Sequence, residues 1–147
     1  KQPYPRGMDP FNLQRFVDAQ APVWDDVRSE LEQARKRSHW MWFVFPQLAA
    51  LGRSGTARFY GIGGADEARA YLEHPVLGAR LHQCCALLLE ATGVSALDVF
   101  GAIDAMKLRS CLTLFEAVSP QTPTFKECLD RYFAGERDPL TKELLAR

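Results

Sequence analysis

The chain has 147 residues, of which 47% are hydrophobic and 24% are charged, which is the size and composition of a single globular domain. Its 18 basic residues are balanced by 18 acidic residues, so the charge argues against a nucleic-acid-binding protein. No apolar run approaches the roughly 18–20 residues of a spanning helix, so the sequence predicts no membrane insertion.

The cysteines and the first residues bear on compartment and domain limits. Four cysteines, at positions 84, 85, 111 and 128, form no CxxC pair, which predicts reduced thiols in a cytoplasmic protein. Residues 1–7 are proline-rich and unpatterned, and Met8 follows them. We therefore expect residues 1–7 to be a disordered tail or a remnant of cloning, and residues 8–147 to form one domain.

The first half of the chain predicts several short helices. Asp9-Pro10 opens a helix over residues 10–19, and Pro22 opens a second helix that ends in the basic residues 35–37. A short helical or extended piece is expected over residues 39–45, before Pro46. Ser54 caps a short helix that runs to Tyr60, and a further helix lies between residues 66 and 75.

The second half predicts longer helices. Residues 76–92 carry the longest apolar pattern, which is typical of a central buried helix. A single turn over 95–100 stops at Gly101, and a helix over 103–117 follows, with Ile103 and Met106 facing inward. Helices over 125–133 and after Asp138-Pro139 complete the chain. No segment predicts a strand pair, so the fold class is all-α, with about seven to nine helices around the helix 76–92.

The familiar catalytic and cofactor motifs do not occur. There is no Walker loop, no GxGxxG after a strand, no HExxH and no GxSxG, so no cofactor is predicted. The segment 61–64, Gly-Ile-Gly-Gly, is more typical of a loop that ends a helix than of a phosphate-binding nest. His74 and His82 lack the spacing of metal ligands, so no metal site is predicted, and His74 is expected to close a helix.

The stretch from Ser38 to Gln47 holds two of the three tryptophans. His39 enters this aromatic cluster, where burial would lower its pKa and suit it to acid–base chemistry; the alternative is a core histidine bonded to a backbone carbonyl. Trp40 and Trp42 cannot face the same way in a helix, so we expect one in the core and the other on a cleft wall. Gln47 can bond a ligand or tie down the turn after Pro46.

A second group of polar residues lies near Lys107. Asp104 and Lys107 form a surface pair in the simplest interpretation, and Ser110 and Thr113 bond back to helical carbonyls. In the functional interpretation, Lys107 and Ser110 lie beside the aromatic stretch and present a cation and a hydroxyl to an anionic ligand. Arg58 and Tyr60 would join them.

Many of these segments resemble one known family. The similarity rests on the run from Ser38 to Gln47, which contains HWMWFVFPQ, and on segments 9–11, 15–20, 51–54, 59–62, 70–78, 80–81, 99–101, 104, 107–110 and 113–115. The chain resembles a bacterial family of small all-helical proteins of unknown function, some of which carry a mistaken calpastatin label. It departs from the family at Ala34, where a glycine is usual, and at Cys111, where a second serine is usual. The resemblance implies an irregular all-α domain and assigns no catalytic residue.

Together these features predict a small-molecule pocket for a nucleotide-like or other planar anionic ligand. Its candidate contacts are the weak catalytic candidate His39 and the ligand-binding candidates Trp42, Gln47, Arg58, Tyr60, His74, Lys107 and Ser110. The alternative is a non-catalytic interaction module or a homo-oligomer without a ligand. Whether the protein is an enzyme stays open at this point.

Overall fold

The structure is a computed structural model that describes residues 8–147, so the predicted tail over residues 1–7 lies outside the described residues. The described part is helical, and its one β-bridge joins Leu48 to Ile62 in parallel. The predicted all-α class is therefore confirmed. The α-helices are α1 (Gln14–Gln20), α2 (Trp24–Glu32), α3 (Met41–Val44), α4 (Gly55–Phe59), α5 (Ala65–Glu73), α6 (Leu77–Glu90), α7 (Ala96–Val118), α8 (Pro123–Phe133) and α9 (Pro139–Ala146), with 3-10 turns over Ala21–Val23 and Ala49–Leu51.

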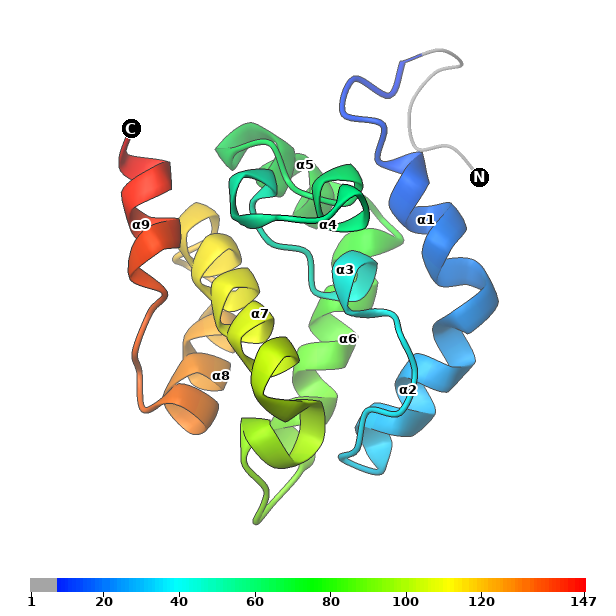
Figure 1. Cartoon of the computed structure of the whole chain (residues 1–147), viewed down its shortest axis with the longest axis vertical. Helices are drawn as coiled ribbons and strands as arrows, with labels where there is room; N and C mark the ends of the chain where they lie inside the picture. The colour runs from blue at the N-terminus through cyan, green and yellow to red at the C-terminus, as the bar shows by residue number, and fades with distance from the viewer. Residues whose placement is uncertain (1–7) are drawn as a thin grey trace.

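Helix α6 is the predicted central helix. It packs against α2, α5 and α8, while α7 packs against α5, α8 and α9 (Figure 1). Figure 1 shows α1 and α2 on one side of α6 and α8 and α9 on the far side of α7. One apolar core runs through all of these helices. Helix α7 contributes more buried residues to this core than α6 does, so the centre of the molecule is a pair of helices.

The four cysteines lie in this centre, on α6, α7 and α8, and all are free and buried. Burial raises the pKa of Cys84 to about 12 and that of Cys111 well above its ordinary value. The hydrogen bond with Cys128, together with burial, raises the pKa of Cys85. The thiols of Cys84, Cys85 and Cys111 therefore stay protonated at neutral pH. All four cysteines serve as small apolar core groups, as the sequence predicts.

Helix α7 bends where the sequence predicts a break. Gly101 has φ 79° and ψ 169°, a region that only glycine adopts readily, and nothing would contact a side chain there. The turn before it begins at Ser95, which forms a capping box with Asp98. The part of α7 after Gly101 buries one side in the core, and another side carries residues of the candidate site.

The end of α2 differs from the prediction. The helix stops at Glu32, and Ala34 has φ 55°, a left-handed conformation that closes the helix. Residues 35–37 therefore follow the helix, and the expectation that they form its charged end was wrong. Ala34 stands where the resemblance predicts a glycine, which is the residue that adopts this conformation without strain.

The first helix also starts later than predicted. Asp9 accepts hydrogen bonds from the backbone N–H groups of Leu13 and Gln14, so its carboxylate closes a turn over residues 9–13. The helix proper begins at Gln14, and the predicted start at residue 10 was wrong. Asn12 has φ 52° within that turn, which is incompatible with a continuous helix from Pro10.

Candidate functional site

An open cleft of about 540 Å³ lies between α7, the start of α9 and the segment that runs from α3 to α4. This volume is within the usual range for small-molecule sites, about 300–1,000 Å³. Its lining combines one tryptophan, several polar groups and three exposed apolar side chains. The lining residues are Trp42, Gln47, Leu51, Gly52, Arg53, Ser54, Ala57, Ile103, Met106, Lys107, Ser110, Asp138 and Leu140.

The short helix α3 divides the two tryptophans between the core and the cleft. Trp40 is fully buried, and its indole N–H donates to Glu30 at 2.9 Å. Trp42 is half-buried and lines the cleft. Trp40 is the N-cap of α3 and has the non-helical φ of −137°, whereas Trp42 is the second residue of the helix, so the two side chains leave the chain in different directions. The prediction of one inward tryptophan and one on a cleft wall is confirmed.

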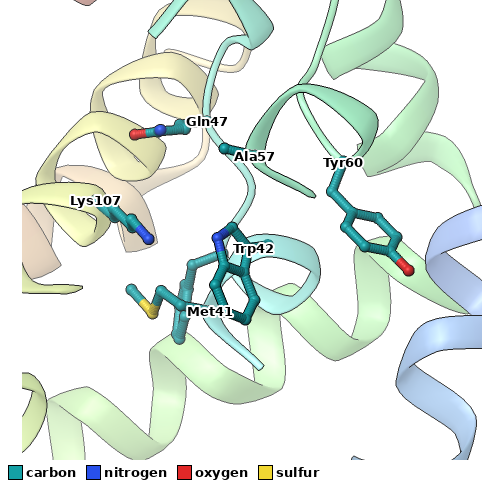
Figure 2. Close-up of a pocket in the computed structure, with 7 residues that line it drawn as sticks. Met41, Trp42, Gln47, Ala57, Tyr60 and Lys107 are labelled. Carbon is teal, nitrogen blue, oxygen red and sulfur yellow. The ribbon is translucent and has the colours of Figure 1, made fainter. Parts of the chain in front are cut away.

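Lys107 extends from α7 toward Trp42, as Figure 2 shows for the residues around a small pocket beside the cleft. Its Nζ lies 5.0 Å from the centre of the Trp42 ring, a cation–π distance, and 3.8 Å from Asp104 Oδ1. The other oxygen of Asp104 is only 2.9 Å from Nζ of Lys36, which is nearly buried. Two cations thus share one carboxylate, and one positive charge is left in excess beside the cleft.

Gln47 and Arg53 supply further polar groups. The backbone of Gln47 is fixed by the N–H of Ile62, which donates to its carbonyl at 2.9 Å, next to the Leu48–Ile62 bridge. Its side-chain amide points toward α7 (Figure 2) and bonds no other described residue. Arg53 is exposed at the cleft, and its guanidinium forms no ion pair within residues 8–147.

Ser110 and Asp138 contribute to the wall of the cleft, although their polar atoms already have partners. The Ser110 hydroxyl donates to the Met106 carbonyl at 3.2 Å, as the sequence predicts. Asp138 caps α9 by accepting from Thr141 N at 3.0 Å, and it lies 3.9 Å from Arg109. The candidates with polar atoms free for a ligand are therefore Gln47, Lys107 and Arg53.

Tyr60 lies at a narrow side pocket of about 10 Å³, which it shares with Trp42, Gln47 and Lys107. Its ring packs against Phe16 and Phe43, and Figure 2 shows it pointing away from Lys107. The side pocket is too small for a ligand, and Tyr60 does not line the main cleft.

Besides Tyr60, the predicted contacts Arg58, His74 and His39 do not line the cleft. Arg58 is exposed and donates to the Arg53 carbonyl at 3.0 Å. His74 is buried, and its Nδ1 accepts from the backbone of Val76 and Leu77, so it opens α6 instead of bonding a terminal carbonyl of α5. Burial lowers its pKa and keeps the ring neutral, as this acceptor role requires.

His39 is exposed on the loop between α2 and α3, so the expectation that it is buried in the aromatic cluster was wrong. The loop turns it outward because Glu30 holds the neighbouring groups inward. The Glu30 carboxylate accepts hydrogen bonds from Ser38 N at 3.1 Å, from the Ser38 hydroxyl at 2.6 Å and from the Trp40 indole.

The glycine segment 61–64 is used internally. Gly63 N–H donates to Glu67 Oε1 at 2.9 Å, so a carboxylate of the chain itself occupies the place of an anion. Among the described residues, no group of three or more His, Cys, Asp or Glu side chains could hold a metal ion. No helix of that part of the chain has the length and apolar character to cross a bilayer.

Nine of the residues that line the cleft were not predicted as contacts, among them Arg53, Ile103, Met106 and Leu140. Ile103 and Met106 were expected to face inward, yet they are 73% and 64% exposed. The core stripe of α7 is formed by residues 105, 108, 111, 112 and 115. Ile103, Met106 and Ser110 form a second stripe at the same helical spacing, and this stripe faces the cleft.

The fold and the cleft define an all-α protein with an open site between its last helices and the segment after α3. Residues 10–145 match the model of a family described as "Protein of unknown function (DUF1810)". The chain belongs to this family, and the predicted membership of an all-helical family of unknown function is confirmed. The structure is similar to the crystal structure of the conserved hypothetical protein Rv1873 from Mycobacterium tuberculosis, with a TM-score of 0.93, 49% identity and coverage of 95% of this chain and 99% of that chain. No curated protein matches the chain.

Proposed function

We propose that the protein binds a small planar anionic ligand, such as a nucleotide, in the cleft between α7 and the segment 42–54. The observation that carries this proposal is the convergence of Trp42, Gln47 and Lys107 on one cleft of about 540 Å³. An aromatic wall, an unpaired amide and a cation are the groups that fix a planar anion by aromatic contact, hydrogen bonding and charge.

The charges of the cleft favour an anion. Lys36 and Lys107 share the single carboxylate of Asp104, and Arg53 adds a second cation at the edge. The Asp138 carboxylate offsets little of this charge, because Arg109 lies 3.9 Å away. An anionic group near Lys107 would therefore gain a charge-assisted hydrogen bond without meeting an unpaired carboxylate.

The proposal is restricted to binding, and it places the protein in the cytoplasm, which the four free thiols support. The alternative function, an interaction module or homo-oligomer, is favoured by Ile103, Met106 and Leu140, which are exposed together at the cleft. A molecular mass that rises with concentration in sedimentation experiments would support that alternative.

The proposal is tested by a thermal-shift screen with nucleotides and other planar anions, followed by calorimetric titration with AMP. A ligand at about 100 times its Kd stabilises the native state by about 2.7 kcal/mol, which corresponds to a rise in Tm of about 5–10 °C for a chain of this size. We expect Lys107→Met to weaken binding by about tenfold or more, because a charge-assisted bond is lost.

Lys142→Met is the matched control, since Lys142 is an exposed lysine of α9 outside the cleft. It should bind the ligand as the unaltered protein does. Equal loss of affinity in both variants, or no ligand that raises Tm, would contradict the proposed function.

A further inference from the structure

In addition to the cation of Lys107, the cleft presents exposed apolar side chains. Three of the six most exposed large apolar side chains in the described residues surround it: Ile103, Met106 and Leu140, which are 73%, 64% and 49% exposed. Ile103 and Met106 belong to α7 and Leu140 to α9, so two packed helices bring the apolar groups to the same opening. A fully polar ligand would leave this surface in contact with water.

The apolar and cationic groups lie in a fixed order along α7. Ile103 precedes Lys107 by one helical turn, which places their backbones about 6 Å apart along the axis. Met106 lies directly before Lys107 and is also turned toward the cleft. A chain of about four carbon atoms attached to a group held at Lys107 would span this distance.

The ring face of Trp42 that Lys107 covers is not open to a ligand. The ammonium lies 5.0 Å from the ring centre, so a flat group that stacks on that face must first displace it. An anion that pairs with Lys107 while its apolar part extends along α7 avoids this displacement. The order of the groups thus favours one arrangement of the ligand.

Resting on the proposed function, we infer that the ligand is amphipathic: an aryl or alkyl carboxylate whose charged group binds Lys107 and whose apolar extension covers Ile103, Met106 and Leu140. Charge complementarity selects the head group, and burial of the exposed apolar surface selects the tail. Within the proposed class of planar anions, this arrangement favours a carboxylate with a hydrocarbon tail over a nucleotide, whose polar sugar would lie against Ile103 and Met106.

The test compares benzoate with 4-butylbenzoate, which share a planar anionic head and differ only in the tail. NMR titration of the labelled full chain gives both affinities. We expect the tail to raise affinity about tenfold or more, because part of four carbon atoms leaves water. In the double variant I103Q/M106Q this advantage should disappear while the affinity for benzoate is kept.

The exposed Leu97 supplies the control, since Leu97→Gln removes an apolar side chain of α7 that does not line the cleft. This variant should retain the tail advantage. Should benzoate and AMP bind in a Lys107-dependent way while the tail adds nothing, or should the advantage survive in I103Q/M106Q, the amphipathic inference fails and the proposed function stands. If none of the three probes binds, both are overturned.

Discussion

Glu30 is a buried carboxylate that organises the loop in front of the cleft. It accepts hydrogen bonds from Arg37 N at 2.7 Å, Ser38 N at 3.1 Å, the Ser38 hydroxyl and the Trp40 indole. Burial alone would raise the pKa of Glu30, but these donors outweigh burial and lower it from 4.5 to about 2. The loop that leads into α3 is thus fixed to the end of α2 by one charged group.

Replacing Glu30 by glutamine should reduce the free energy of unfolding by about 3 kcal/mol at pH 7, since the charged acceptor of four donors is lost. The folded-state pKa lies below the unfolded value, so the stabilisation is complete above pH 4.5 and is lost as the pH falls toward 2. Urea unfolding at pH 7 and pH 3 checks this, with Glu32→Gln, an exposed residue of α2, as control. A difference between E30Q and the unaltered protein that does not shrink at pH 3 would refute the assignment.

At the level of single residues, the sequence could predict the division of Trp40 and Trp42, because two side chains this close in a short helical segment leave the chain in different directions. It could not predict that His39 is exposed. The orientation of His39 is set by Glu30, which precedes the loop and whose partners are known only from the tertiary structure. The sequence could likewise not predict the charge environment of Lys107. Lys107 shares the Asp104 carboxylate with Lys36, which lies far away in the sequence.

At the level of helices, the end of α2 carries a measurable strain. Ala34 has φ 55°, and Arg35 N–H donates to the Glu30 carbonyl at 2.9 Å across this left-handed residue, as in a Schellman motif. A non-glycine residue in that conformation costs roughly 1–2 kcal/mol.

Ala34→Gly should therefore raise the free energy of unfolding by about 1 kcal/mol, as measured by urea or thermal unfolding. The matched control is Ala91→Gly at the end of α6, where φ is −68° and glycine offers no relief. That variant should be neutral or slightly destabilised. Equal effects of the two substitutions would show that the conformation of Ala34 carries no strain.

Helix α7 shows why a periodic pattern alone misplaces site residues. The helix has two apolar stripes, and the sequence pattern does not state which one faces the core. The stripe with Leu108 and Cys111 is buried against neighbouring helices, whereas the stripe with Ile103 and Met106 faces the cleft. The caps at Ser54, Ser95 and Asp138 were predictable because their signals are local, whereas the start of α1 and the end of α2 were not.

Across the whole molecule, Arg15 connects the first helix to the segment between α4 and α5. Its guanidinium donates to Glu67 at 2.7 Å and to the carbonyls of Phe59 and Gly61 at 2.8 and 3.0 Å. The Arg15–Glu67 pair is about nine-tenths buried. Since Glu67 also binds Gly63 N–H, this one ion pair fixes α1 against the chain that leads from the cleft to α5.

Arg15→Met should lower the free energy of unfolding by about 3 kcal/mol, because it leaves the Glu67 carboxylate buried without its partner. Arg69→Met, which removes an exposed pair with Asp66, should change it by less than about 0.5 kcal/mol. Chemical unfolding of both variants checks the difference. The cost of R15M should also decrease in an E67Q background, and two independent, additive effects would contradict the coupling.

The four thiols buried between α6, α7 and α8 allow opening of the protein centre to be measured by chemical labelling. A thiol-specific reagent cannot reach Cys84, Cys85, Cys111 or Cys128 while these helices remain packed, since all four are buried. Their rate of labelling under native conditions therefore reports how often the centre of the molecule opens. A ligand bound in the cleft beside α7 would stabilise the native state and slow this labelling, whatever its chemical identity. Slower labelling of the buried cysteines would therefore report ligand binding on the other side of α7.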